Sequence, residues 1–167
     1  MKVTPKEFVT LLYPFAKQIE TETGLSSIAI MSQAALESGW NSTPQGFNFF
    51  GIKDTDGING NEQLITTTEY LKNPNAKFPV IISKVLDPVK KLYKYIVKDY
   101  FRKYNTPADS FRDHVKFFQV NKRYATAWSV RKDYNRFFEE IAKAGYATAP
   151  NYSDILKGVA KTILKNI

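Results

Sequence analysis

A single glutamate within an apolar segment is the first candidate for chemistry in this sequence. Glu37 lies in the segment Ala-Ala-Leu-Glu-Ser-Gly-Trp at residues 34–40. We expect Ile28, Met31 and the apolar residues of this segment to surround Glu37 with hydrocarbon at the end of a helix. Poor solvation of the charged form raises the pKa of a carboxyl group, and a carboxyl that stays protonated near neutral pH can act as a general acid. The simpler alternative is a glutamate at a helix end whose carboxylate reaches water.

Two predicted helices position this glutamate. Thr4 and Glu7 form a capping box, and apolar residues then recur at helical spacing until Gly24, which can end the first helix. The second helix is predicted to start at residue 26 or 27 and to end just beyond Glu37.

A loop and a β lobe are predicted next. Residues 41–61 are rich in Gly, Asn, Asp, Ser and Thr and have no helical period, which is typical of a loop. Residues 63–71 have the β-branched and aromatic content of a strand, and residues 92–101 alternate as its antiparallel partner would. The connection 72–91 contains prolines and the β-prone sequence Val-Ile-Ile, and it is longer than a simple hairpin loop. These patterns predict a β-hairpin lobe over about residues 62–101.

The rest of the chain is predicted to be helical. Thr106 begins one helix as a cap, and a short helix over residues 124–128 follows. A longer helix begins near residue 134 and ends at Gly145, and Ser153 is expected to cap the last one.

Six short segments, in order along nearly the whole chain, carry a family resemblance. They are Ser-Gln-Ala-Ala-Leu-Glu-Ser-Gly-Trp at 32–40, Asn-Phe-Phe-Gly-Ile-Lys at 48–53, Thr-Thr-Glu-Tyr at 67–70, Phe-Arg-Lys-Tyr at 101–104, Ser-Phe-Arg-Asp-His at 110–114 and Gly-Tyr-Ala-Thr at 145–148. Each is weak alone, but together they resemble the glucosaminidase family of peptidoglycan hydrolases, glycoside hydrolase family 73, which includes flagellar muralytic domains, autolysins and phage lysins. The predicted fold class is therefore mainly α (α+β), with a lysozyme-like helical domain and a small β-hairpin lobe flanking a cleft. Residues 1–167 are expected to form one glucosaminidase-type catalytic domain.

The resemblance implies hydrolysis of the GlcNAc-β-1,4-MurNAc bond in cell-wall glycan. This reaction needs a proton for the leaving oxygen and stabilisation of positive charge at the anomeric carbon. Glu37 matches the family's acid, and Glu69 matches its carboxylate on the β lobe. If Glu69 points away, the alternatives are Glu62, Asp54 and Asp56. A carboxyl separation of ~5 Å would favour a nucleophile-like second carboxylate and ~6.5–9.5 Å an activated water, while the N-acetyl group of the substrate is a third possible nucleophile.

The C-terminal motif adds a tyrosine to this expected site. Tyr146 matches the family's active-site tyrosine. A phenol with a pKa near 10 is a poor base at neutral pH, so we expect Tyr146 to bond the acetamido group or Glu37. Ala149 stands where the family usually has Asp, which makes the local backbone harder to predict.

Aromatic residues near Glu37 could line a sugar-binding groove or belong to the core. We expect Trp40 and Phe50 to point mainly inward. The expected substrate-binding residues are Phe47, Asn48, Trp40 and Tyr70.

The net charge and the numbers of histidines and cysteines limit the kinds of binding partner and cofactor to expect. The formal charge of +8, from 24 Lys and Arg against 16 Asp and Glu, predicts attraction to polyanions. No run of five basic residues occurs, which favours peptidoglycan strands over nucleic acid. His114 is the sole histidine and there is no cysteine, so we expect no metal, no cofactor and a structural hydrogen bond for His114.

The N-terminal residues and the hydropathy of the chain indicate where in or outside the cell the protein is expected to act. Residues 1–7 enter a helix pattern directly and lack the apolar stretch and cleavage site of a secretory signal. No apolar run is long enough for membrane insertion. We expect a monomer that acts at the cell wall as an autolysin or endolysin, by an extracellular, periplasmic or phage-delivered route. The alternatives are an N-acetylmuramidase of lysozyme type and a non-catalytic cell-wall-binding module.

Overall fold

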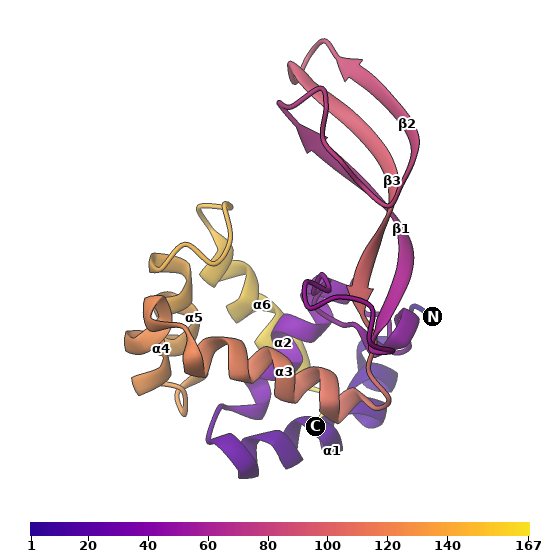
Figure 1. The fold of residues 1–167 in the computed structure, drawn as a ribbon. Helices are drawn as coiled ribbons and strands as arrows, with labels where there is room; N and C mark the ends of the chain where they lie inside the picture. The colour runs from indigo at the N-terminus through magenta and orange to yellow at the C-terminus, as the bar shows by residue number, and fades with distance from the viewer. The chain divides into compact units, whose positions relative to one another are not determined.

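The computed structural model describes all residues from 1 to 167, and the chain divides into two units. The helical unit comprises Met1–Gly51 and Tyr104–Ile167, and the sheet unit comprises Ile52–Lys103. Figure 1 shows the helices of the first unit and the three strands of the second. No helix combines the length and the apolar character that crossing a bilayer requires.

Helix α1, Pro5–Thr23, has the predicted start and end. Thr4 Oγ1 accepts a hydrogen bond from the backbone N–H of Glu7, and the Glu7 carboxylate accepts one from the backbone N–H of Thr4. At the other end, Gly24 takes a φ of 78°, a left-handed conformation that costs glycine little. The capping box and the glycine end are therefore confirmed.

Helix α2, Ser27–Ser38, is the central helix of the helical unit. Every residue from Ser27 to Ala35 is buried, and the helix packs against α1, α5 and α6. At its C-terminal end the helix leaves the core, and Gly39 and Trp40 take φ values of 60° and 61°. This backbone reversal ends the helix at Ser38, one residue after Glu37.

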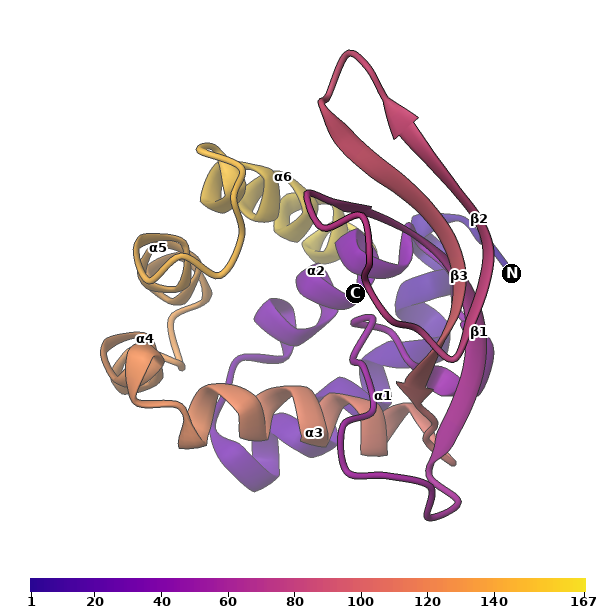
Figure 2. The same ribbon diagram turned by 45° about the horizontal axis from the view of Figure 1, so that its top comes forward.

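Four further helices complete the helical unit, as Figure 2 shows. They are α3 (Pro107–Val120), α4 (Ala125–Ser129), α5 (Tyr134–Lys143) and α6 (Tyr152–Leu164), with short 3-10 helices η1 (Gln45–Phe47) and η2 (Lys122–Tyr124). Thr106 caps α3 as predicted. The predicted cap of the last helix was wrong, because α6 begins at Tyr152 and Asn151 takes the cap position in place of Ser153.

The sheet unit has three antiparallel strands. They are β1 (Glu62–Leu71), β2 (Val80–Asp87) and β3 (Leu92–Arg102), in the spatial order β1-β3-β2. The predicted pairing of β1 with β3 is confirmed, from Glu62 opposite Arg102 to Leu71 opposite Tyr93. The hairpin itself needs correction, because the β-prone part of the connection forms β2 on the other edge of β3.

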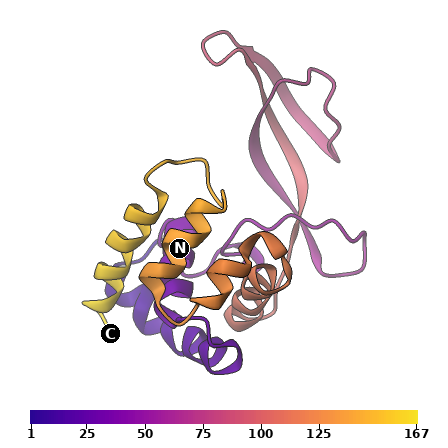
Figure 3. The ribbon, with the colours of Figure 1, turned by 90° about the vertical axis from the view of Figure 1, so that its left-hand side faces the viewer.

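The segment 72–79 crosses one face of this sheet. Since β1 and β2 both run antiparallel to β3, the chain must return along the sheet between them. Tyr95 holds the returning segment: its hydroxyl donates to the Asn73 carbonyl over 2.7 Å and accepts from the Ala76 N–H over 3.3 Å, and its ring packs on Phe78. We call this side of the sheet the covered face and the other side the open face. Figure 3 shows the sheet from another side.

The core of the helical unit contains a group of interlocked aromatic rings around Phe118. The Phe118 side chain is fully buried, and its ring packs edge-on against Phe137 and Tyr124 at centroid distances of 5.2 and 5.1 Å. Its neighbour Phe117 is 42% exposed. These two adjacent phenylalanines therefore offer a matched test of the core.

We expect Phe118→Ala to lower the free energy of unfolding by about 3–5 kcal/mol, because it removes a buried ring and leaves a cavity. Phe117→Ala deletes the same atoms from a half-exposed position and is expected to cost much less. Equilibrium unfolding in urea, followed by circular dichroism, measures both. Equal losses for the two variants would show that Phe118 is not a centre of this core.

Candidate active site

Glu37 lies in the last turn of α2, where its side chain is exposed at the surface of the helical unit. The prediction that Ile28, Met31 and their apolar neighbours would surround it was wrong. Those residues are buried deeper along α2, and Glu37 lies beyond them where the helix leaves the core. The surroundings of the carboxyl still penalise its charge. This desolvation raises the pKa of Glu37, against the smaller opposite effect of a hydrogen bond from Tyr152.

A chain of three hydrogen bonds leads from the core to this carboxyl. His114 is buried, and burial lowers its pKa to about 3, so the imidazole is neutral and donates from Nε2 to Gln33 Oε1 over 2.9 Å. Gln33 is also buried, and its Nε2 donates to the Tyr152 hydroxyl over 3.4 Å. The Tyr152 hydroxyl in turn donates to Glu37 Oε1 over 3.2 Å. In this bond Oε1 of Glu37 is the acceptor, so a proton on the carboxyl group would be carried by Oε2.

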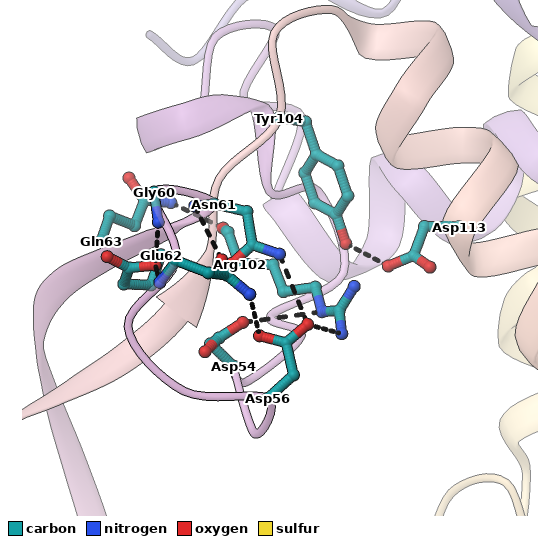
Figure 4. Close-up of polar contacts among 10 residues, drawn as sticks. Asp54, Asp56, Gly60, Asn61, Glu62, Gln63, Arg102, Tyr104 and Asp113 are labelled. Carbon is teal, nitrogen blue, oxygen red and sulfur yellow. Dashed lines mark hydrogen bonds and ion pairs between the residues drawn. The ribbon is translucent and has the colours of Figure 1, made fainter.

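The expected structural hydrogen bond of His114 is therefore confirmed. Its ring also stacks on Phe50, with centroids 3.6 Å apart and planes 5° from parallel. Its neighbour Asp113 accepts a hydrogen bond of 2.6 Å from the Tyr104 hydroxyl, at the right of Figure 4. Asp113 and His114 are adjacent in the sequence but belong to different hydrogen-bond networks.

Tyr146 is next to this chain of hydrogen bonds without joining it. Its ring stacks on Tyr152 with centroids 5.6 Å apart. Burial, and then the nearby Glu37 carboxylate, raise the pKa of Tyr146 well above its usual range. The tyrosine that bonds Glu37 is Tyr152, four residues beyond the motif at 145–148, and sequence reasoning did not single it out. Tyr152 is the first residue of α6, but the start of that helix was predicted two residues too late.

The aromatic segment after α2 combines packing with unusual backbone. Trp40 packs edge-on against Phe8, at 5.4 Å, and Phe50 packs on His114, so both point inward as expected. Asn48 is buried, at 9% exposure. Phe47 is half-buried, and it and Trp40 both take positive φ, 49° and 61°, which non-glycine residues rarely do. Such backbone concentrates at functional sites, which keeps Phe47 and Trp40 among the substrate-binding candidates.

The second predicted carboxylate, Glu69, lies on the covered face of the sheet unit. It is opposite Tyr95 in the register, and its side chain is 27% exposed. Lys53 Nζ lies 3.0 Å from Glu69 Oε1 and 3.0 Å from Asp99 Oδ2, so one ammonium group holds both carboxylates. Partial burial by itself lowers the pKa of Lys53, but these bonds raise it on balance and keep the amine charged. Glu69 is thereby fixed in position.

Tyr70 points to the other side of the same strand. Side chains alternate along a strand, and Tyr70 is opposite Lys94 on the open face, with Lys90 Nζ 3.7 Å from its ring centroid. Glu69 and Tyr70 therefore do not line one surface of the sheet, although they are neighbours in the motif. Tyr70 as a substrate-binding residue remains a prediction without support from this placement.

Of the three alternative acids, Asp54 and Asp56 lie in the loop before β1 and Glu62 is the first residue of that strand, as Figure 4 shows. Asp54, with 3% of its side chain exposed, and Asp56 both pair with Arg102, at 3.9 and 3.2 Å. Burial and the adjacent Asp56 raise the pKa of Asp54. Glu62 Oε2 accepts hydrogen bonds from the backbone N–H groups of Asn59 and Gly60, which lower its pKa. These contacts give all three acids structural partners within the sheet unit.

No group of three or more His, Cys, Asp or Glu side chains is arranged to hold a metal ion. The acid, the tyrosines and the aromatic segment belong to the helical unit, and Glu69 with its lysine belongs to the sheet unit.

Comparison with known proteins places this arrangement among glycoside hydrolases. The solved structure of a C-terminally truncated glycoside hydrolase domain from Salmonella typhimurium FlgJ is 28% identical, with a TM-score of 0.71, over 97% of this chain and 99% of that one. The fold is therefore that of a glycoside hydrolase domain. The family model described as mannosyl-glycoprotein endo-beta-N-acetylglucosaminidase matches residues 13–165, and the chain belongs to this glucosaminidase family.

Two curated relatives agree with this assignment. The peptidoglycan hydrolase FlgJ of Vibrio parahaemolyticus is 32% identical over 96% of this chain, and that of Vibrio cholerae is 33% identical over 88%. The chain spans 48% and 40% of the lengths of these two relatives. The similarity therefore concerns about half or less of each relative.

Proposed function

We propose that this chain is an endo-β-N-acetylglucosaminidase that hydrolyses the GlcNAc-β-1,4-MurNAc bond of peptidoglycan. The family match runs through both units, which supports a single catalytic domain formed by the helical and sheet units together. The relatives named as peptidoglycan hydrolases support the substrate. A hydrolase of this kind acts at the cell wall, outside the cytoplasmic membrane.

The observation that carries the proposal is the state of Glu37. Its carboxyl is accessible at the surface, its pKa is raised, and Tyr152 occupies one of its two oxygens. An acid that is protonated at a higher pH than usual can deliver a proton to a glycosidic oxygen. Since Tyr152 donates to Oε1, the proton of Glu37 is available on Oε2 for the leaving group.

Glu69 is proposed as the second carboxylate. Its ion pair with Lys53 holds its position on the covered face. During bond cleavage, positive charge develops at the anomeric carbon, and a fixed carboxylate can stabilise it, attack it or activate a water molecule. Tyr146 is proposed to bond the acetamido group of the substrate, with Phe47, Asn48 and Trp40 contacting the sugar rings.

Fragment analysis tests the function directly. Purified peptidoglycan is treated with the wild-type protein, and the new reducing ends are identified by mass spectrometry. Ends in N-acetylglucosamine are expected. Ends in N-acetylmuramic acid would establish a muramidase in its place, and no release from several wall types by folded protein would leave a wall-binding module.

A variant of Tyr152 tests the hydrogen bond to Glu37. We expect Tyr152→Phe to lower the turnover rate at least about tenfold, because hydrogen bonds to charged groups contribute about 1.5–3 kcal/mol. The bond lowers the pKa of Glu37, so its removal raises this pKa further. The decline of activity with rising pH should therefore move to higher pH.

Tyr146→Phe provides the matched control for this prediction. It removes a hydroxyl from the ring that stacks on Tyr152, but no hydrogen bond joins Tyr146 to Glu37. The alkaline limb of the pH–rate profile should stay nearly in place in this variant. An unchanged profile for Tyr152→Phe would show that the hydrogen bond does not tune the acid.

A further inference from the structure

The open face of the sheet unit carries exposed aliphatic side chains. In the register, Val85 is opposite Lys94 and Val80 is opposite Lys98, so these four side chains share the face with Tyr70. Val85 is 62% exposed and Val80 is 41% exposed. At the end of the sheet, Val89 in the turn between β2 and β3 is 90% exposed. Exposed aliphatic groups that lie together on a surface can mark a site of contact.

The same part of the chain is strongly basic. Its lysines, all exposed, are Lys72, Lys77, Lys84, Lys90, Lys91, Lys94 and Lys98. The sole acid between residues 72 and 98 is Asp87. Asp87 Oδ1 accepts the backbone N–H groups of Lys90 and Val89, both over 3.0 Å, which fixes the turn and lowers the pKa of Asp87. The carboxylate of Asp87 therefore has its hydrogen-bond partners within the turn.

The two faces of the sheet are chemically distinct. Glu69 and Asp99 lie on the covered face, where Lys53 pairs with both. The open face between Tyr70 and Thr66 of β1 carries no acid, and its central strand presents Lys94 and Lys98. A ligand on the open face therefore meets positive charge together with hydrocarbon.

We propose that the open face and the β2–β3 turn dock on the surface of a bilayer that contains anionic phospholipids. Lysines near such a surface are attracted to its headgroups, and Val85 and Val89 can enter the boundary between headgroups and acyl chains. A phosphate-rich polymer would satisfy the lysines but would gain nothing from the aliphatic groups. The contact is peripheral and agrees with the lack of a helix that could cross the membrane.

The alternation of side chains keeps this docking separate from the proposed chemistry. Glu69 projects from the covered face, so a bilayer on the open face does not cover it. Strand β2 pairs with the edge of β3 that β1 does not use. The sheet can therefore carry the acid on one side and the lipid contact on the other.

Sedimentation with vesicles tests the charge requirement. The full chain is mixed with vesicles of phosphatidylglycerol and phosphatidylcholine in equal parts, and with vesicles of phosphatidylcholine alone. We expect binding to the anionic vesicles only. Replacing Lys94→Gln together with Lys98→Gln should weaken it about thirtyfold, at about fivefold per lysine. The control Lys161→Gln with Lys165→Gln makes the same charge change on exposed positions at the end of the helical unit and should leave binding nearly unchanged.

The aliphatic residues separate a lipid from other partners. Val85→Ser with Val89→Ser should weaken vesicle binding at least several-fold and leave binding to soluble polyphosphate unchanged. Equal binding of the wild type and this variant to anionic vesicles would show that the target is a polyanion and not a bilayer. Equal binding to neutral and anionic vesicles, no binding to either, or dimers of the free protein that Val85→Ser with Val89→Ser disrupts would each overturn the proposal.

Discussion

Replacing Glu37→Gln is expected to lower the turnover rate on peptidoglycan by about 10³-fold, because an amide of the same shape cannot supply the proton of a general acid. In the wild type, the raised pKa of Glu37 keeps the acid protonated to higher pH than an ordinary glutamate would be. Activity should therefore persist above the usual titration range of a carboxyl and decline as the pH rises through the pKa of Glu37. This decline should be absent from the residual activity of the variant.

The matched control for Glu37→Gln is Glu140→Gln. It makes the same chemical change in the helical unit, at a partly exposed glutamate that pairs with Lys143. Reducing-end release over a range of pH measures both variants, and circular dichroism establishes that both are folded. If Glu37→Gln kept more than a tenth of the wild-type rate, Glu37 would not be the acid.

Replacing Glu69→Gln is expected to lower the turnover rate by at least about 10²-fold. The amide has no negative charge with which to stabilise the anomeric centre or to activate a nucleophile. The change also removes one of the two carboxylates that Lys53 holds. A loss of activity could therefore come from the chemistry or from the broken ion pair, and a second variant must separate the two.

Asp99→Asn makes this separation, because it removes the other carboxylate bound to Lys53 at the same N···O distance of 3.0 Å. The charge change and the damage to the ion pair are matched, but Asp99 has no proposed part in catalysis. We expect Asp99→Asn to retain most of the activity. Equal losses in the two variants would assign the effect to Lys53 and its ion pairs, and Glu69 would lose its proposed role.

Elements with strong local signals were predictable from the sequence. The capping box at Thr4, the left-handed glycines at positions 24 and 39 and the cap at Thr106 are each specified within a few residues. The β1–β3 pairing was also predictable, because strand composition is a local property. The alternation of polar and apolar residues did not reveal the pairing partner of residues 80–87. That pairing depends on the unpaired edge of β3, which is a property of the folded sheet.

The position of Glu37 near the end of a helix was predictable from the sequence, but its surroundings were not. The apolar residues that precede Glu37 in the sequence do not enclose its side chain, which is exposed. In the structure, they fill the core, and the groups that act on Glu37 come from distant segments: Tyr152 from α6, with Gln33 and His114 behind it. Such contacts depend on helix packing, which a single sequence does not specify.

The crossing segment 72–79 has a consequence for the order in which the sheet assembles. Strands β2 and β3 are joined by a tight turn, whereas β1 must wait for the whole of residues 72–91 to return before it meets β3. Closing the longer loop costs more chain entropy, and local hairpins form within microseconds. We therefore expect the amide hydrogens shared by β2 and β3 to gain protection from exchange before those of β1 during refolding. On this pathway, the β2–β3 hairpin forms first, and the strand with Glu69 then pairs with the free edge of β3.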